Sequence, residues 1–198
     1  MAEPPPIPPS PAGFGWRSLA CLADITPLFI CGHAVAGFTA DAQALAAYAR
    51  QQQWIRSFAE LYVKALSSPG QEANRRILDH VLHPAAADVD AVVAWSWHVG
   101  TATFFVMLAA LTAQEATTGT TLGKRMFRLR TVSLPDAGRP GFLAALLRSA
   151  WKSAFFALPN PFFMLLGIVN FHVPLFRKDR RAWHDLWTRT QVVEGVRR

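Results

Sequence analysis

The sequence predicts a mainly α-helical integral membrane protein. We expect two full transmembrane helices, a kinked or re-entrant third element, an external helical insert, and a small cytoplasmic cap with a short two-stranded β pairing. Three observations lead to this fold class. The 198 residues are 52% hydrophobic and only 17% charged, a balance too apolar for an ordinary soluble domain. Three apolar runs are each long enough to enter a bilayer. The basic residues gather in two of the segments that flank these runs.

The first membrane element is the run of residues 15–38, which follows a proline-rich stretch, residues 1–14. The prolines favour an extended, disordered tail, and the stretch lacks the basic region and cleavage site of a secretory signal. Within the run, Arg17 and Asp24 are separated by close to two helical turns, so they share one face of the helix. Charges at membrane depth are costly and usually mark a pairing or an ion path. We therefore expect this face to meet something polar.

The insert, residues 39–90, is predicted to be helical and external. Good helix formers with apolar residues at helical spacing predict a helix from about residue 41 to 66, and QEANRRILDHVLH predicts a shorter amphipathic helix. The segment holds five basic and six acidic residues, so the positive-inside rule places it outside. We expect a cap packed on the ends of the spans, with a surface that docks a partner as the alternative.

The second span is predicted at residues 91–112, which carry no formal charge. It is followed by residues 113–148, with six basic and two acidic residues, and the chain ends with residues 177–198, with seven basic and three acidic. Both segments are therefore predicted to be cytoplasmic, as is the N-terminus. These features predict a protein of a bacterial-type inner (plasma) membrane.

Two short stretches in the cytoplasmic segments have extended character. Residues 129–134 alternate in character and include β-branched residues, as strands do, and the turn-forming sequence PDAG follows them directly. Residues 190–193, with the sequence TQVV, are the matching stretch near the C-terminus. Because charge counting places both on the same side of the membrane, we expect them to pair as two strands.

The third membrane element, residues 149–176, has to return to the cytoplasmic side. Pro159, Asn160 and Pro161 interrupt it, and two full spans would need about 40 residues. We therefore expect an interfacial helix over residues 142–156 that leads into a re-entrant or short hairpin element.

A second acidic residue of interest, Asp185, lies in the sequence RRAWHDLWTR beside His184. Trp183 and Trp187, four residues apart, predict a short amphipathic helix with its tryptophans at the depth of the lipid headgroups. We expect the carboxylate to face the basic segments and to pair with Arg17 or with Lys124 or Arg125; a solvent-exposed carboxylate is the alternative.

Three histidines lie one in each apolar element. His33, His98 and His172 are formal candidates for haem ligands, but polar packing explains each equally well, and no spacing within a helix supports a haem. The sequence contains no Walker loop, dinucleotide fingerprint, HExxH or GxSxG motif. We therefore expect no enzyme activity, no metal and no cofactor, and the placement of the basic residues favours a membrane over nucleic acid.

Taken in order, several of these motifs resemble the RDD family of membrane proteins. The motifs are RSLACLAD in the first span, TTLGKRMFRLRTV after the second, an arginine-bearing entry to the third element (Arg148), and RRAWHDLWTRTQVV at the end. The family is named for one Arg and two Asp, which Arg17, Asp24 and Asp185 match. The resemblance implies a role as a cation/proton antiporter or transport component, or as an accessory subunit of a larger assembly. The long insert is a departure from the family pattern.

Two functional hypotheses remain open at this stage. In the first, the chain is an accessory or scaffolding subunit in which Arg17, Asp24 and Asp185 hold the first span to the cytoplasmic cap. In the second, it is a small oligomeric cation/proton antiporter in which Asp24 binds the ion. A nearby guanidinium keeps a carboxylate ionised, which suits a structural pair better than a proton carrier. We expect as partners the lipid bilayer and other membrane subunits, or further copies of this chain.

Overall fold

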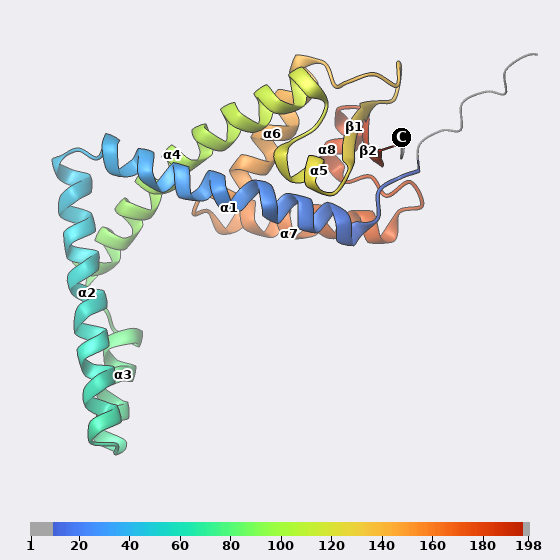
Figure 1. Cartoon of the computed structure of the whole chain (residues 1–198). Helices are drawn as coiled ribbons and strands as arrows, with labels where there is room; N and C mark the ends of the chain where they lie inside the picture. Colours follow the sequence, from blue (N-terminus) through green and yellow to red (C-terminus); the bar gives the residue numbers. More distant parts are fainter. Residues whose placement is uncertain (1–9, 196–198) are drawn as a thin grey trace, which may run out of the picture. The chain divides into compact units, whose positions relative to one another are not determined.

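The computed structural model describes residues 10–195 of the chain and is mainly helical. The chain divides into two compact units, one formed by residues up to Val35 together with those from Gly100 onward, the other by Ala36–Val99. Figure 1 shows the elements in order. The elements are α1 (Phe14–Thr39), α2 (Ala42–Ser67), α3 (Gln71–Leu82), α4 (Ala86–Thr118), α5 (Leu122–Met126), β1 (Leu129–Ser133), α6 (Phe142–Ala157), α7 (Pro161–Phe176), α8 (Trp183–Trp187) and β2 (Thr190–Glu194).

Helices α1 and α4 are both long and apolar enough to cross a membrane, with mean hydropathies of 1.7 and 1.4 over their most apolar 18 residues. Each extends beyond the run predicted from the sequence, because the flanking residues remain helical. The two helices approach closely at Gly32, where a Cβ atom would lie 2.6 Å from the Cα of Thr103. Small residues commonly permit such approach between membrane helices.

The third apolar element is a pair of helices, α6 and α7, of 16 residues each. Pro161 is the first residue of α7, and the Asn160 side chain accepts hydrogen bonds from the Phe162 and Phe163 amides. At 1.5 Å per residue each helix is about 24 Å long, shorter than the hydrocarbon core of about 30 Å. The predicted interfacial helix corresponds to α6, and the proline break is the turn between the two.

The predicted strand pairing is confirmed. β1 and β2 are antiparallel, with Thr131 opposite Val192 at the centre. Before α1, Pro11 forms a bridge to Val193 and the Ala12 amide donates to the Val192 carbonyl, 3.0 Å away. The predicted disordered tail, residues 1–14, therefore extends too far along the chain, because backbone hydrogen bonds fix residues 11 and 12 on β2. Residues 1–9 of that tail lie outside the described residues.

Each of the two strands is the second half of a repeated helix–turn–strand motif. In the first copy, α5 leads through Arg128 (φ 55°) into β1; in the second, α8 leads through Arg189 (φ 49°) into β2. Helix starts, left-handed turn residues and strand starts all recur 61 residues apart. The same offset relates Thr131 to its own partner Val192, so the two copies are related by an approximate two-fold axis through that pair.

The second unit, residues 36–99, contains the predicted helices of the insert. Asp41 caps α2 by accepting a hydrogen bond from the Ala44 amide, as Asp does at many helix starts. α2 and α3 form a hairpin in which Trp54 and His80 stack with ring centroids 5.2 Å apart. Arg50 on α2 forms an ion pair of 2.7 Å with Asp88 at the start of α4.

Candidate functional site

The centre of the first unit holds a set of linked ion pairs, which we call the charge network. Its members are Arg17, Glu115, Lys124, Arg148, Lys152 and Asp185. They come from α1, α4, α5, α6 and α8, so the network joins helices that are distant in the sequence.

One end of the charge network is Glu115, near the end of α4. Its side chain is completely buried, and three cations surround it: Lys124, Arg148 at 2.9 Å and Lys152 at 2.8 Å. A buried carboxylate is tolerated only when it is paired and hydrogen-bonded, and three cations meet that need.

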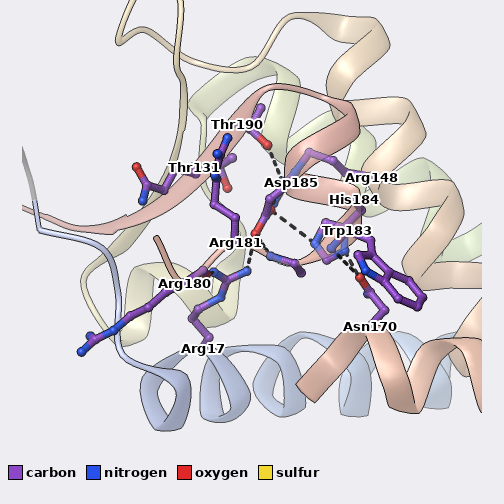
Figure 2. A network of polar contacts seen from close by, with 12 residues as sticks. Arg17, Thr131, Arg148, Asn170, Arg180, Arg181, Trp183, His184, Asp185 and Thr190 are labelled. Atoms are coloured by element: carbon purple, nitrogen blue, oxygen red, sulfur yellow. Dashed lines mark hydrogen bonds and ion pairs between the residues drawn. The ribbon is translucent and has the colours of Figure 1, made fainter. Parts of the chain in front are cut away.

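The other end is Asp185 on α8, also completely buried. Its Oδ1 pairs with Arg148, and its Oδ2 accepts from Arg17 Nη2 at 2.6 Å and from the Ala182 amide at 3.0 Å. Figure 2 shows Arg17 and Arg148 approaching this carboxylate from two sides. The prediction that Asp185 pairs with a basic residue is confirmed with Arg17 as that residue, and the solvent-exposed alternative is wrong.

Arg148 connects the two ends. Its side chain is fully buried on α6, with Nε on Glu115 and Nη1 on Asp185 and on the Thr190 hydroxyl at 2.5 Å. Burial alone would lower the pKa of Arg148, but Glu115 and Asp185 outweigh it and raise that pKa above its ordinary value. Burial likewise acts to raise the pKa of Asp185, but Arg148 and Arg17 hold it well below its ordinary value. Both groups are therefore fixed as ions.

Asp24 is held differently, by neutral donors. Its carboxylate accepts from the Thr121 hydroxyl at 2.5 Å and from the Gly123 amide at 2.6 Å. The helices are close here because residue 123 lacks a side chain: a Cβ atom on Gly123 would lie 2.0 Å from the Ala20 carbonyl oxygen. Asp24 thus binds the start of α5 to α1.

The two charged residues of α1 therefore bind one copy of the repeated motif each. Asp24 binds the first copy through Thr121 and Gly123, and Arg17 binds the second through Asp185 and the Arg180 carbonyl. The predicted common face is confirmed, since both side chains point into the first unit: Asp24 is 8% exposed and the Arg17 side chain 13%. An Arg and an Asp two turns apart on α1 therefore make two separate attachments.

Three further motif residues were singled out in the sequence: Lys124 and Arg125 after the second span, and His184 beside Asp185. Of these, Lys124 and His184 are buried. Lys124 contacts Glu115 and donates to the Thr131 hydroxyl at 2.7 Å; burial lowers its pKa to about 7, although Glu115 opposes this shift. His184 Nδ1 lies 3.1 Å from the Asn170 amide nitrogen, and its Nε2 lies 3.4 Å from Asp185. Burial also lowers the pKa of His184 well below its ordinary value, so the ring is neutral near pH 7. Arg125 is exposed.

The three histidines singled out as formal haem ligands each contact a backbone carbonyl. His33 and His172 contact carbonyls of their own helices, Phe29 and Ile168, and His98 contacts Ala36 at 3.0 Å. Within residues 10–195, no group of three or more His, Cys, Asp or Glu side chains is placed to hold a metal ion.

Sequence reasoning missed Glu115 and Lys152 as members of the site. The available signal was on α6, where Arg148 and Lys152 are four residues apart in a helix that is otherwise uncharged. Two cations on one helix face among apolar residues require a buried acid nearby. Glu115 is the acid that ends the second apolar run.

Comparison with protein families agrees with this geometry. A family model described as the RDD family matches residues 11–189. The chain belongs to the RDD family. The matched range contains Arg17, Asp24 and Asp185, and the resemblance seen in the sequence is confirmed over nearly the whole chain. Comparisons with curated proteins and with solved structures give no match.

Proposed function

We propose that this RDD protein is a non-enzymatic accessory or scaffolding subunit of a larger complex in a bacterial-type inner membrane, with its N-terminus and C-terminal tail in the cytoplasm. Family membership and two helices of membrane length fit a membrane protein. The observation that carries the accessory role is the state of Asp24, whose carboxylate is bonded to the Thr121 hydroxyl and the Gly123 amide. Those bonds hold the fold together and give Asp24 a structural task.

The rest of the charge network supports the same role. Arg148 is bonded to both Glu115 and Asp185, and all three side chains are fully buried. Removing one member of a buried ion pair is strongly destabilising, so the network resists the changes of charge that a transport cycle requires. It acts as a rigid support for the cap.

The second unit offers a surface for the partner. α2 and α3 carry exposed large apolar side chains, among them Leu66, 66% exposed, and Leu82, 65% exposed. The positive-inside rule favours an outside position for this unit, where lipid tails would not cover it. Exposed apolar side chains on a water-facing helical pair favour contact with another protein.

The alternative function, a small oligomeric cation/proton antiporter that uses Asp24, is favoured by one observation. Asp24 and Lys124 line the same cavity of the first unit, and burial brings the pKa of Lys124 to about 7. A carboxylate and a lysine that titrates near neutral pH could exchange a proton for a cation.

Purification of the full chain from its native membrane in a mild detergent, followed by native mass measurement, tests the proposal. We expect a stoichiometric assembly with at least one other membrane protein. Leu66→Gln should reduce recovery of that partner, whereas Lys64→Gln, a matched change two residues away on the same helix, should not. A homo-oligomer with no other protein would contradict the accessory role.

A further inference from the structure

A cavity that opens to solvent lies in the first unit beside the charge network, and it has about 90 Å³ of space for the centres of water-sized molecules. Its lining divides by chemistry. One part is cationic and includes Arg17, Lys124, Arg148 and Lys152. The other part is apolar, with aromatic and aliphatic side chains, and comes mainly from α1, α4, α6 and α7; it includes Phe14, Ile25, Met107, Leu111, Phe155 and Phe171.

The charges that face the cavity do not balance. Among the described residues that line it, four cations stand against the single carboxylate of Asp24. Glu115 and Asp185 do not line the cavity but are bonded to these cations, so four cations face three carboxylates in all. The cationic part of the cavity therefore favours an anion.

Two buried donors at the cavity also lack an acceptor. Arg148 Nη2 and Trp151 Nε1 have no hydrogen-bond partner within residues 10–195, although both residues line the cavity. Arg148 is fully buried, and its other two guanidinium nitrogens are bonded. Figure 2 shows this guanidinium at the side of Asp185. Buried donors are nearly always paired in folded proteins. Both atoms have less than 1 Å² of accessible surface, so an acceptor oxygen in the cavity reaches them after a small side-chain movement.

We propose that this cavity binds an anionic amphiphile, with its phosphate or carboxylate head group on Arg148, Lys152 and Trp151 and its acyl chain along the apolar part of the lining. A small soluble anion would satisfy the donors and leave the apolar wall exposed to water. A neutral lipid would cover the wall and leave the donors unpaired. One molecule with both parts satisfies both requirements. This binding is independent of the accessory role, since a partner-free chain would bind the same ligand.

Native mass spectrometry of the full-length chain in a neutral detergent tests the proposal with four probes. Lysophosphatidate and oleate carry the two anionic head groups, lysophosphatidylcholine carries no net charge, and inorganic phosphate lacks the chain. We expect one equivalent of lysophosphatidate or oleate to bind, and the tighter of the two identifies the head group. Equal binding of lysophosphatidylcholine, or of inorganic phosphate, would overturn the proposal.

Two variants probe the two parts of the ligand separately. Lys152→Gln removes one cation and should weaken binding about tenfold, the effect of one charged hydrogen bond; Lys178→Gln, at an exposed site, is the control. Cys21→Phe keeps every charge and fills the apolar part of the cavity, so it should prevent binding of the acylated probes while the family fold is retained. Wild-type binding by both variants would contradict the proposed site.

Discussion

Arg17 and Asp185 lie 168 positions apart in the sequence and form an ion pair of 2.6 Å between α1 and α8. Asp24, on the same face of α1, holds α5 through Thr121 and Gly123. One helix thus binds both copies of the repeated helix–turn–strand motif. Arg17, Asp24 and Asp185 thus form two attachments, one charged and one built on neutral donors.

Replacement of Asp185 should strongly destabilise the folded protein. Asp185→Asn leaves Arg17 and Arg148 without their shared anion in a buried site, and breaking such pairs costs about 3–5 kcal/mol. Denaturant or thermal unfolding in detergent measures the loss. Asp179→Asn, a change in a more exposed group of ion pairs with Arg177 and Arg181, should cost less than about 1 kcal/mol. Equal effects of the two variants would argue against the charge network as a structural element.

A single methyl group at residue 123 should separate α5 from α1. Gly123→Ala places a Cβ atom 2.0 Å from the Ala20 carbonyl, so the Asp24 hydrogen bonds to Thr121 and Gly123 must lengthen or break. We expect a lower yield of folded protein and a lower unfolding temperature. At Gly141 nothing lies within 4 Å of an added Cβ atom, and Gly141→Ala is the control; if both variants behave like wild type, the close approach is wrong.

Acid should weaken the fold through Asp185. Its pKa is lower in the folded chain than the ordinary value of 3.8, so below that value the unfolded state binds more protons than the folded state. The stabilisation by this carboxylate is complete above about pH 4 and is lost as the pH falls further. Unfolding measured from pH 7 down to pH 2 should show a steeper loss for wild type than for Asp185→Asn. Parallel profiles would refute this assignment.

Lys124 should make the stability depend on pH in the same direction, but in the alkaline range. Burial lowers its pKa from 10.5 to about 7, so between these values the folded chain has released a proton that the unfolded chain still holds. Stability from this group therefore rises with pH over that window. The difference in unfolding free energy between wild type and Lys124→Met should grow from pH 7 to pH 10, and Lys178→Met, at an exposed site, should show no such trend. A constant Lys124→Met difference would mean that the ammonium titrates normally.

Much of the fold could be predicted because its signals are local. The lengths of the apolar runs indicated α1 and α4, the proline break indicated the α6–α7 turn, and alternating β-branched residues with charge counting indicated the β1–β2 pair. The helical repeat also placed Arg17 and Asp24 on one face. These features depend on the sequence within one or two turns or on the composition of a segment.

The site was harder to predict because its contacts are long-range. Glu115 meets cations from α5 and α6, and no periodicity encodes which helices converge on it. The partners of Asp24 were missed for another reason: the expectation was that a buried charge needs a countercharge, whereas a hydroxyl and a backbone amide serve here. A glycine at residue 123, which lets the backbone approach, was the only local sign.

The measurement that tests the structural role of Asp24 most directly is cation flux driven by a pH gradient in proteoliposomes, with wild type, Asp24→Asn and Asp24→Leu compared at equal protein. Asn keeps an acceptor oxygen for the Gly123 amide but removes the titratable group, whereas Leu leaves both donors unpaired. Our account predicts a folded Asp24→Asn protein, a depleted Asp24→Leu protein, and no flux that depends on Asp24. A wild-type flux that Asp24→Asn abolishes in a stably folded protein would contradict it and establish the antiporter.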